Sequence, residues 1–214
     1  MPKLLTGPIR EWLKAQFSVR QYDAWACSEL GRCLRWQWFR RTEAEWEPPK
    51  NVLNMMRSFE VGNAVDAMVK RWLIGTFGDE FTPDVEVRKP EWDLLGHMDG
   101  LHTKPAVIEV KSAASFSYSK IGDAPEKAYF WKQAHAYLWC AEVDEGILLI
   151  LNLDSKTWKE IEYTLDWEVI AQIMSDLTVL SEALMRGEPP VPDYECSQSD
   201  HRNCPFTKVC RETR

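Results

Sequence analysis

Hydrophobic residues recur at intervals of three and four in two long stretches, which predicts two amphipathic helices. The first stretch is Ser58–Ile74, and its apolar face includes one acidic residue, Asp66. The second begins after Asp166, a residue type that caps helices, and ends before Gly187. Shorter helices are predicted over Arg10–Phe17, Asp23–Thr42 and Pro125–Cys140.

Short apolar segments bounded by turn residues predict five strands. These are Asp84–Arg88, Leu94–Leu101, Ala106–Lys111, Gly146–Leu153 and Trp158–Leu165. Because strands and helices alternate without repeats or linkers, we expect one α/β domain over residues 1–214. It has a helical, basic part (1–57), a core (58–187) and a cysteine-bearing segment (188–214), which is loop-like from Val191 onward.

The composition is that of an ordinary globular protein, with 45% hydrophobic and 28% charged residues among 214. No apolar stretch is long enough to span a membrane, and the first residues lack the apolar region of a signal peptide. We therefore expect a cytoplasmic protein with no membrane partner. In a reducing compartment, the six cysteines are better interpreted as metal ligands than as disulfides.

Charge is distributed unevenly along the chain. Residues 1–41 contain eight lysines and arginines and three acidic residues, which gives a net charge of +5. Since the whole chain carries −7, residues 42–214 carry a net charge of −12. An acidic protein does not attract nucleic acid as a whole, so any such contact requires a local basic face. The alternative is a solvated amphipathic N-terminus.

The most informative run combines Asp99 with the strand segment Ala106–Lys111. Since side chains alternate along a strand, Glu109 and Lys111 share one face, and a hairpin would bring Asp99 beside Glu109. Two converging carboxylates suit a hard cation such as Mg²⁺ or Mn²⁺, and Lys111 would position or deprotonate the attacking water. The alternative is a surface Glu–Lys pair, with Asp99 as a turn residue.

Asp99 followed by Glu109-x-Lys111 resembles the PD-(D/E)xK nuclease signature. Gln133 and Tyr137 resemble the Gln-x-x-x-Tyr motif of its RecB-like branch, and both lie on one helix face. The segment Phe59–Asp66 is similar to the helix motif of that branch, with Asp66 where the family has a histidine. The alternatives are that Gln133 and Tyr137 only pack against each other, and that Asp66 is solvated or paired with Lys70.

This resemblance implies a restriction-endonuclease-like core, a mixed central β-sheet flanked by helices, and divalent-metal hydrolysis of phosphodiesters. It assigns Asp66, Asp99, Glu109 and the Val110 carbonyl as metal ligands. The other catalytic residues would be Lys111, Gln133 and Tyr137.

Four cysteines complete the resemblance to iron–sulfur exonucleases of the CRISPR-associated Cas-four type. Ser28-x-Leu30-x-x-Cys33 resembles the opening of those nucleases, and Cys196, Cys204 and Cys210 form the C-terminal set. Four thiolates suit a [4Fe–4S] cluster, whereas three with His201 suit Zn²⁺. Either centre would join the N- and C-terminal segments. The two remaining cysteines, Cys27 and Cys140, are interpreted as small buried residues.

The resemblance thus implies a prokaryotic or phage-encoded DNA exonuclease acting on single strands or free ends, in recombination, phage DNA processing or CRISPR adaptation. Arg35, Arg40 and Arg41 would bind nucleic acid, and the aromatic residues between them would either stack on bases or pack in the core. A helicase, recombinase or integrase is a candidate protein partner. The alternatives are a structure-selective endonuclease and a catalytically silent, metal-stapled DNA-binding subunit.

Overall fold

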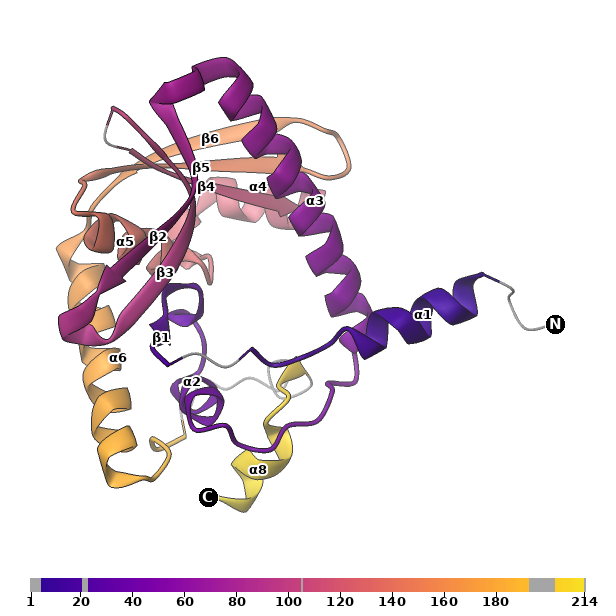
Figure 1. Ribbon diagram of the computed structural model, residues 1–214, viewed down its shortest axis with the longest axis vertical. Helices are drawn as coiled ribbons and strands as arrows, with labels where there is room; N and C mark the ends of the chain where they lie inside the picture. The colour runs from indigo at the N-terminus through magenta and orange to yellow at the C-terminus, as the bar shows by residue number, and fades with distance from the viewer. Residues whose placement is uncertain (1–4, 21–22, 105, 193–202, 214) are drawn as a thin grey trace. The chain divides into compact units, whose positions relative to one another are not determined.

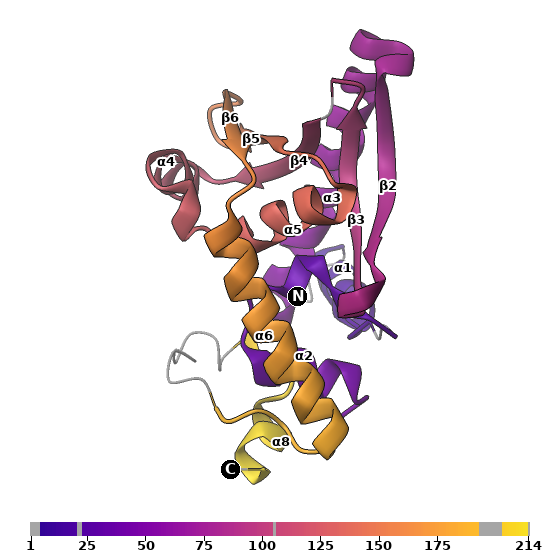
Figure 2. The same ribbon diagram turned by 90° about the vertical axis from the view of Figure 1, so that its left-hand side faces the viewer.

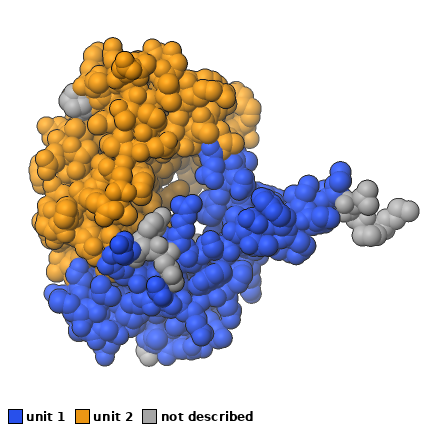
Figure 3. Space-filling view, viewed as in Figure 1, with its two compact units in different colours: residues 1–23, 33–63, 179–214 blue, residues 24–32, 64–178 orange. Residues whose placement is uncertain are grey.

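A computed structural model describes residues 5–20, 23–104, 106–192 and 203–213. The chain folds as two compact units, coloured separately in Figure 3. Unit 1 comprises residues 1–23, 33–63 and 179–214, and unit 2 comprises residues 24–32 and 64–178. The single-domain organisation inferred from the sequence stays a prediction.

Unit 2 is built on a six-stranded sheet with the order β1-β3-β4-β5-β6, in which β2 also pairs with β3 (Figure 1). Its strands are β1 (Trp25–Ala26), β2 (Phe81–Lys89), β3 (Leu94–His102), β4 (Ala106–Ala113), β5 (Glu145–Asn152) and β6 (Trp158–Thr164). The pairs β1–β3 and β4–β5 are parallel and the others antiparallel. All five predicted strands are present, and the sheet is mixed, as the fold-class prediction required.

Helices cover both faces of this sheet (Figure 2). From Ala64 onward, α3 (Val52–Phe77) belongs to unit 2, and its Val65 and Val69 pack with Ile108 and Val110 of β4. The intervening Glu109 points the other way, toward α5 (Trp131–Ala141), because side chains alternate along a strand. The residue types of β4 therefore divide into an apolar face toward α3 and a polar face toward α5.

The predicted helix Asp23–Thr42 is wrong in its first half. The structure has β1, the short 3₁₀ helix η1 (Cys27–Glu29) and then α2 (Leu34–Arg41). Trp25 and Ala26 are buried and pair with β3, so tertiary pairing overrides the local helical pattern.

Two differences concern the segment before α5. The predicted helix Pro125–Cys140 splits into the 3₁₀ helix η4 (Pro125–Lys127) and α5. A further helix, α4 (Ser115–Asp123), was not predicted, because its serine-rich sequence has low helix propensity. Asp154 compensates by accepting the backbone N–H of Ser115 at its first turn, at 2.8 Å.

The long C-terminal helix α6 (Trp167–Arg186) confirms its prediction, including both ends. Asp166 accepts the backbone N–H of Glu168 at 2.8 Å, and Gly187 follows the helix with a left-handed φ of 70°. The boundary between the units falls within this helix, after Thr178. Among the helices described, none is long and apolar enough to cross a membrane.

Unit 1 contains α1 (Thr6–Ala15), α2, the first part of α3, the end of α6 and α8 (Thr207–Glu212). Leu13 packs with Val52 and Met56, and the rings of Phe39 and Phe206 lie 5.8 Å apart. The prediction that the chain is loop-like after Val191 is wrong over α8, where Cys210 lies on a helix.

Candidate active site

The site begins where β3 and β4 separate. Their pairing runs from His102↔Ala106 to Gly100↔Ile108 and stops there. Beyond that point the Asp99 carboxylate takes the place of a backbone partner, because its Oδ2 accepts the N–H of Val110 at 2.7 Å. Two adjacent strands thereby bring Asp99 beside Glu109, as the sequence predicted.

Glu109 is the most buried carboxylate of the group, at 1% exposure. Its Oε1 accepts hydrogen bonds from Lys111 Nζ and from Gln133 Nε2, the latter at 3.1 Å, whereas its buried Oε2 has no partner among the described residues. Burial raises the pKa of Glu109 to about 7, against the lowering effect of Lys111. A buried carboxylate with a free oxygen suits a cation that supplies the missing charge.

Lys111 and Asp99 share this environment. Burial alone would lower the pKa of Lys111, but the carboxylates of Glu109 and Asp99 raise it, so the side chain is an ammonium. The pKa of Asp99 is raised by burial, with Lys111 and the Val110 N–H acting in the opposite direction. Two carboxylates therefore share one ammonium in this part of unit 2.

A second ammonium, that of Lys70, lies among the remaining carboxylates. Its Nζ is 2.8 Å from Asp66 Oδ2 and 3.7 Å from Asp99 Oδ1, and it also contacts Asp84. Burial would lower the pKa of Lys70, but hydrogen bonds to Asp66 and Asp84 raise it. The Asp66–Lys70 pair considered as an alternative is thus present, although Asp66 Oδ1 is buried without a partner among the described residues.

The sequence interpretation missed Asp84. Pro83 pairs with Gly100 and Val85 with Met98, so Asp84 stands opposite Asp99, and it has a left-handed φ of 52°. Like charges facing each other across a strand pair are unfavourable, and Lys70 neutralises this pair. A Pro-Asp dipeptide inside an apparent strand was the available signal, since proline marks a strand irregularity.

Gln133 and Tyr137 form a hydrogen-bonded relay on α5. Gln133 Nε2 also donates to Tyr137 Oη at 2.9 Å, and that hydroxyl donates to the His97 carbonyl at 2.8 Å. The Tyr137 ring covers Gly96, where a Cβ would lie 2.6 Å from ring atom Cε1. Burial raises the pKa of Tyr137, so the hydroxyl stays protonated and fixes Gln133 against Glu109.

The chemical type of the candidate ligand atoms suits a hard divalent cation. All the candidate ligands are oxygens, contributed by α3, β3 and β4, and two of them, Glu109 Oε2 and Asp66 Oδ1, are buried without partners in the part of the chain described. Within that same part, no three His, Cys, Asp or Glu side chains are arranged as a ready ligand group. The ammoniums of Lys70 and Lys111 lie between the carboxylates instead.

The cysteines of unit 1 are only partly described. Cys33, Cys204 and Cys210 are partly buried, and the pKa of Cys204 is raised to about 11 by burial, with Cys33 and Cys210 near enough to raise it further. Cys196 and His201 lie outside the described residues. The cysteine centre therefore stays a prediction. Of the other two cysteines, Cys27 is fully buried and Cys140 partly so.

The structure does not favour the predicted arginine contacts with nucleic acid. Arg35 and Arg40 are only 3% and 7% exposed. Arg35 donates to the Pro190 carbonyl at 2.9 Å and to Cys210 Sγ at 3.2 Å, and Arg40 donates to the Arg20 carbonyl. Arg41 is partly buried. The guanidiniums of Arg35 and Arg40 join segments of unit 1. The buried aromatic rings of Trp38 and Phe39 beside them pack in the core, which was the alternative to stacking on bases.

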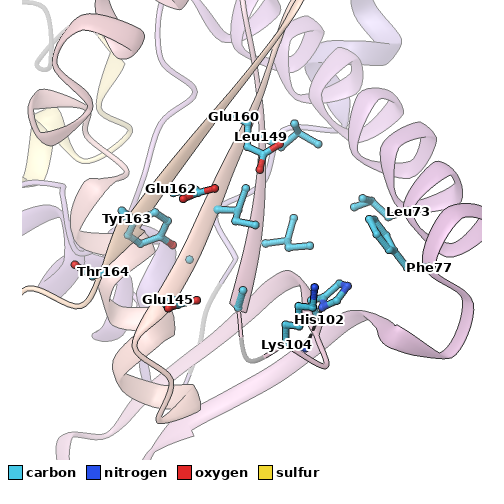
Figure 4. Close-up of a pocket in the computed structure, with 14 residues that line it drawn as sticks. Leu73, Phe77, His102, Lys104, Glu145, Leu149, Glu160, Glu162, Tyr163 and Thr164 are labelled. Carbon is cyan, nitrogen blue, oxygen red and sulfur yellow. Dashed lines mark hydrogen bonds between the residues drawn. The ribbon is translucent and has the colours of Figure 1, made fainter.

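A cavity of about 640 Å³ lies elsewhere on unit 2 (Figure 4). It is lined by Leu73, Phe77, His102, Lys104, Ala106, Ile108, Glu145, Gly146, Ile147, Leu149, Glu160, Glu162, Tyr163 and Thr164. None of the predicted catalytic residues lines it, and the three glutamates would repel a polyanion. It therefore lacks the groups that the predicted catalytic site requires.

No family model and no curated protein matches this chain. Solved structures do. A protein named SSO0001 is 18% identical with a TM-score of 0.57, and the match covers 99% of this chain and 98% of that one. The alkaline exonuclease LHK-Exo from Laribacter hongkongensis is 14% identical, with a TM-score of 0.58 alone and 0.60 in complex with dAMP. Both of those matches cover 83% of this chain and 93% of the exonuclease. At such identities the likeness shows a shared fold, the mixed α/β architecture that this chain has in common with an alkaline exonuclease.

Proposed function

We propose that the protein is a divalent-metal-dependent deoxyribonuclease that hydrolyses phosphodiester bonds. The observation that carries the proposal is the joining of Asp99, Glu109, Lys111 and Gln133 where β3 and β4 separate. The fold shared with an alkaline exonuclease, which was also solved in complex with dAMP, supports the same assignment.

Asp66, Asp99, Glu109 and the Val110 carbonyl are the proposed holders of Mg²⁺ or Mn²⁺. When bound, the metal would supply Lewis acidity for the phosphate and lower the pKa of a bound water. The two oxygens without partners among the described residues, Glu109 Oε2 and Asp66 Oδ1, lie near the Asp99 carboxylate. For Asp66 to bind the metal, the Lys70 ammonium must move away from it, and Asp84 offers Lys70 a second carboxylate.

Lys111 serves as an electrostatic group in this scheme. Because its pKa is raised, it is protonated at neutral pH, so it stabilises developing negative charge and orients water but does not deprotonate it. Gln133 fixes the Glu109 carboxylate, and Tyr137 fixes Gln133. Gln133 and Tyr137 therefore act by positioning.

An exonuclease of the RecB-like branch is favoured over an endonuclease, through the Gln133–Tyr137 motif and the exonuclease neighbours. A catalytically silent DNA-binding subunit is disfavoured because Asp99, Glu109 and Lys111 are all present. The proposed settings are recombination, phage DNA processing and CRISPR adaptation, with a helicase, recombinase or integrase partner.

The deciding experiment is a cleavage assay with Mg²⁺ or Mn²⁺ on linear DNA labelled at either end and on closed circular DNA. Linear DNA should be degraded and circular DNA spared. Glu109→Ala and Lys111→Ala should each reduce the rate by roughly 100- to 1,000-fold. Glu160→Gln, on the far face of the sheet, is the matched control and should leave the rate unchanged. Activity unaffected by either alanine variant would overturn the assignment.

The cysteine centre is a separate proposal. Cys33, Cys196, Cys204 and Cys210 would hold a [4Fe–4S] cluster, or three of them with His201 would hold Zn²⁺. It is supported by the nearness of Cys33 and Cys210 to Cys204 and by the hydrogen bond from Arg35 to Cys210 Sγ, which would stabilise a thiolate. A brown protein bleached by dithionite would indicate the cluster, and a colourless one with stoichiometric zinc the alternative. Metal content unchanged by Cys33→Ala would refute both, with Cys140→Ala as the control.

A further inference from the structure

Strand β5 is apolar on both of its faces but is fully covered on only one. Leu148 and Ile150 on one face are 0% exposed, whereas Ile147 and Leu149 on the other face are only half-buried. A strand that is apolar on both faces is typical of a sheet that is covered on both faces. The described residues therefore leave part of the second face of β5 uncovered.

The path of α3 explains why this part of the sheet is open. The ring of Trp72 lies 5.5 Å from that of Trp158 at the start of β6, whereas Phe77, further along the helix, lies 5.1 Å from the ring of His102 in β3. The helix thus passes obliquely from β6 to β3, and the cavity of about 640 Å³ occupies the space that it leaves over β5 and β6. Figure 4 shows Leu73 and Phe77 of α3 on one side of this cavity and the glutamates on the strands opposite.

The open part of this face has an apolar floor and an acidic edge. In the register of the two strands, Ile147 pairs with Glu162 and Leu149 with Glu160, so each floor residue has a carboxylate beside it. Since β6 is the last strand of the sheet, these carboxylates form its outer edge. The sheet groove is defined here as Leu73, Phe77, Ile147, Leu149, Glu160 and Glu162.

The charge along this cavity is negative. Three exposed glutamates line it: Glu145, Glu160 and Glu162. The lining also includes Lys104 and His102, and the His102 Nδ1 accepts the backbone N–H of Lys104 at 3.0 Å. Lys159 lies between two of the glutamates in sequence, but its ammonium is 5.3 Å from the Tyr118 ring, on the opposite face of β6. The groove therefore favours a cationic ligand over an anionic one.

We propose that the sheet groove docks an amphipathic helix of a partner protein that carries lysine or arginine along one edge. The apolar side chains of that helix cover Ile147 and Leu149, and its cations pair with Glu160 and Glu162. The helix completes the layer that α3 leaves incomplete, since an open apolar sheet face is stabilised by packing against another element. Charge complementarity selects a basic helix among the possible coverings.

The spacing of the two carboxylates defines the ligand further. Glu160 and Glu162 are two residues apart on a strand, which corresponds to about 6.8 Å. Residues i and i+4 of a helix are about 6 Å apart along its axis, so a helix lying along β6 can present one cation to each carboxylate. Its apolar anchors should follow the i, i+3, i+4, i+7 spacing of helices that bind in grooves.

Fluorescence anisotropy of labelled peptides tests the inference with the full chain in EDTA, at about 0.15 M salt. The probe is a synthetic helix of about 15 residues with leucines on one face and lysines on the other. One comparison peptide has glutamate in place of lysine, and a second has the same composition as the probe in an order without an apolar face. The protein should bind the probe at least about tenfold more tightly than either comparison peptide.

A reversal of charge in the groove should reverse this preference. Glu160→Lys combined with Glu162→Lys should weaken binding of the basic helix at least about tenfold and create affinity for the acidic one. Ile147→Gln, which places a polar group on the floor, should weaken binding by about tenfold. The matched control is Asp123→Lys combined with Glu126→Lys, which makes the same change in net charge at exposed positions that do not line the cavity. Affinity in the control should change by less than about threefold.

Several results would overturn the inference. These are equal losses in the groove pair and the control pair, equal affinity for the reordered peptide, and no binding at about 100 μM peptide. Sedimentation of the protein alone covers the remaining case, because self-association that the groove pair abolishes would assign the groove to a second copy instead. Since Glu160 and Glu162 are exposed, the groove pair should melt like the parent protein and stays informative even if Ile147→Gln unfolds. None of these measurements involves DNA or a metal, so their outcome is independent of the proposed function.

Discussion

The acid–lysine site of unit 2 and the cysteine-bearing region of unit 1 both bury a cation, but they use it differently. Lys111 is held against carboxylates, one of which keeps a free oxygen. Arg35 is held by the carbonyls of Pro190, Cys210 and Thr213, which are structural acceptors from the end of the chain. Buried charge in unit 2 thus lies beside an unsatisfied carboxylate oxygen, whereas in unit 1 it connects segments.

Replacing each cation by methionine would test this difference, with Lys111→Met expected to have the largest effect. Turnover should fall by roughly 100- to 1,000-fold, because a fixed positive charge near the phosphate is lost. Stability should change little, since Glu109 is then free to become neutral. A variant that melts far below the parent would mean that Lys111 is structural, like Arg35.

Arg35→Met should show the opposite pattern. Several charge-assisted hydrogen bonds disappear from a buried site, and we expect a loss of about 3 kcal/mol in the free energy of unfolding. The turnover of the folded fraction should be retained. Chemical denaturation measures the first quantity and active-site-normalised kinetics the second. Unchanged stability would contradict the connecting role.

The pH dependence of metal binding would sharpen the comparison. The folded-state pKa of Glu109 is raised from 4.5 to about 7, so its carboxylate forms only as pH rises through that value. Affinity for Mn²⁺ should therefore increase up to about tenfold per pH unit below pH 7 and level off above it. In the metal-free protein the same shift makes this group's contribution to stability decrease from about pH 4.5 to about pH 7. Calorimetric titration at pH 6, 7 and 8 measures the affinity, and a flat profile would contradict the assignment of Glu109 as a ligand.

The smallest expected effect is that of Gln133→Ala. It removes hydrogen bonds to Glu109 and Tyr137, each worth about 1 kcal/mol, so turnover should fall about tenfold. Affinity for Mn²⁺ should stay within about two-fold, because Gln133 is not a proposed ligand. Tyr137→Phe is the milder companion variant, since it keeps the ring over Gly96. A large loss of metal affinity in Gln133→Ala would mean that the residue does more than position Glu109.

Features that depend on local patterns were predictable from the sequence. The strand alternation around Glu109 and the i, i+4 spacing of Gln133 and Tyr137 were sufficient to anticipate their contacts. The caps of α6 at Asp166 and Gly187 were likewise evident from residue type.

Features that depend on distant partners were not predictable. The pairing of Trp25 with Leu94 replaced a helix by a strand, and Asp154 permitted α4 in a serine-rich segment. Asp84 joined the site only because β2 places it opposite Asp99. Arg35 was assigned to nucleic-acid binding, because its carbonyl acceptor at Pro190, more than 150 positions away, is not evident from the sequence.

The alternation of charge along β6 makes the length of the preceding turn a determinant of how β6 packs against α4. Lys159 lies between Trp158 and Glu160, so insertion or deletion of one residue among Asp154–Thr157 would turn the strand over. Glutamates would then face α4, and the contact between the Lys159 ammonium and the Tyr118 ring would be lost. Over evolution, this short turn should tolerate changes of residue type far better than changes of length, although it contacts no substrate.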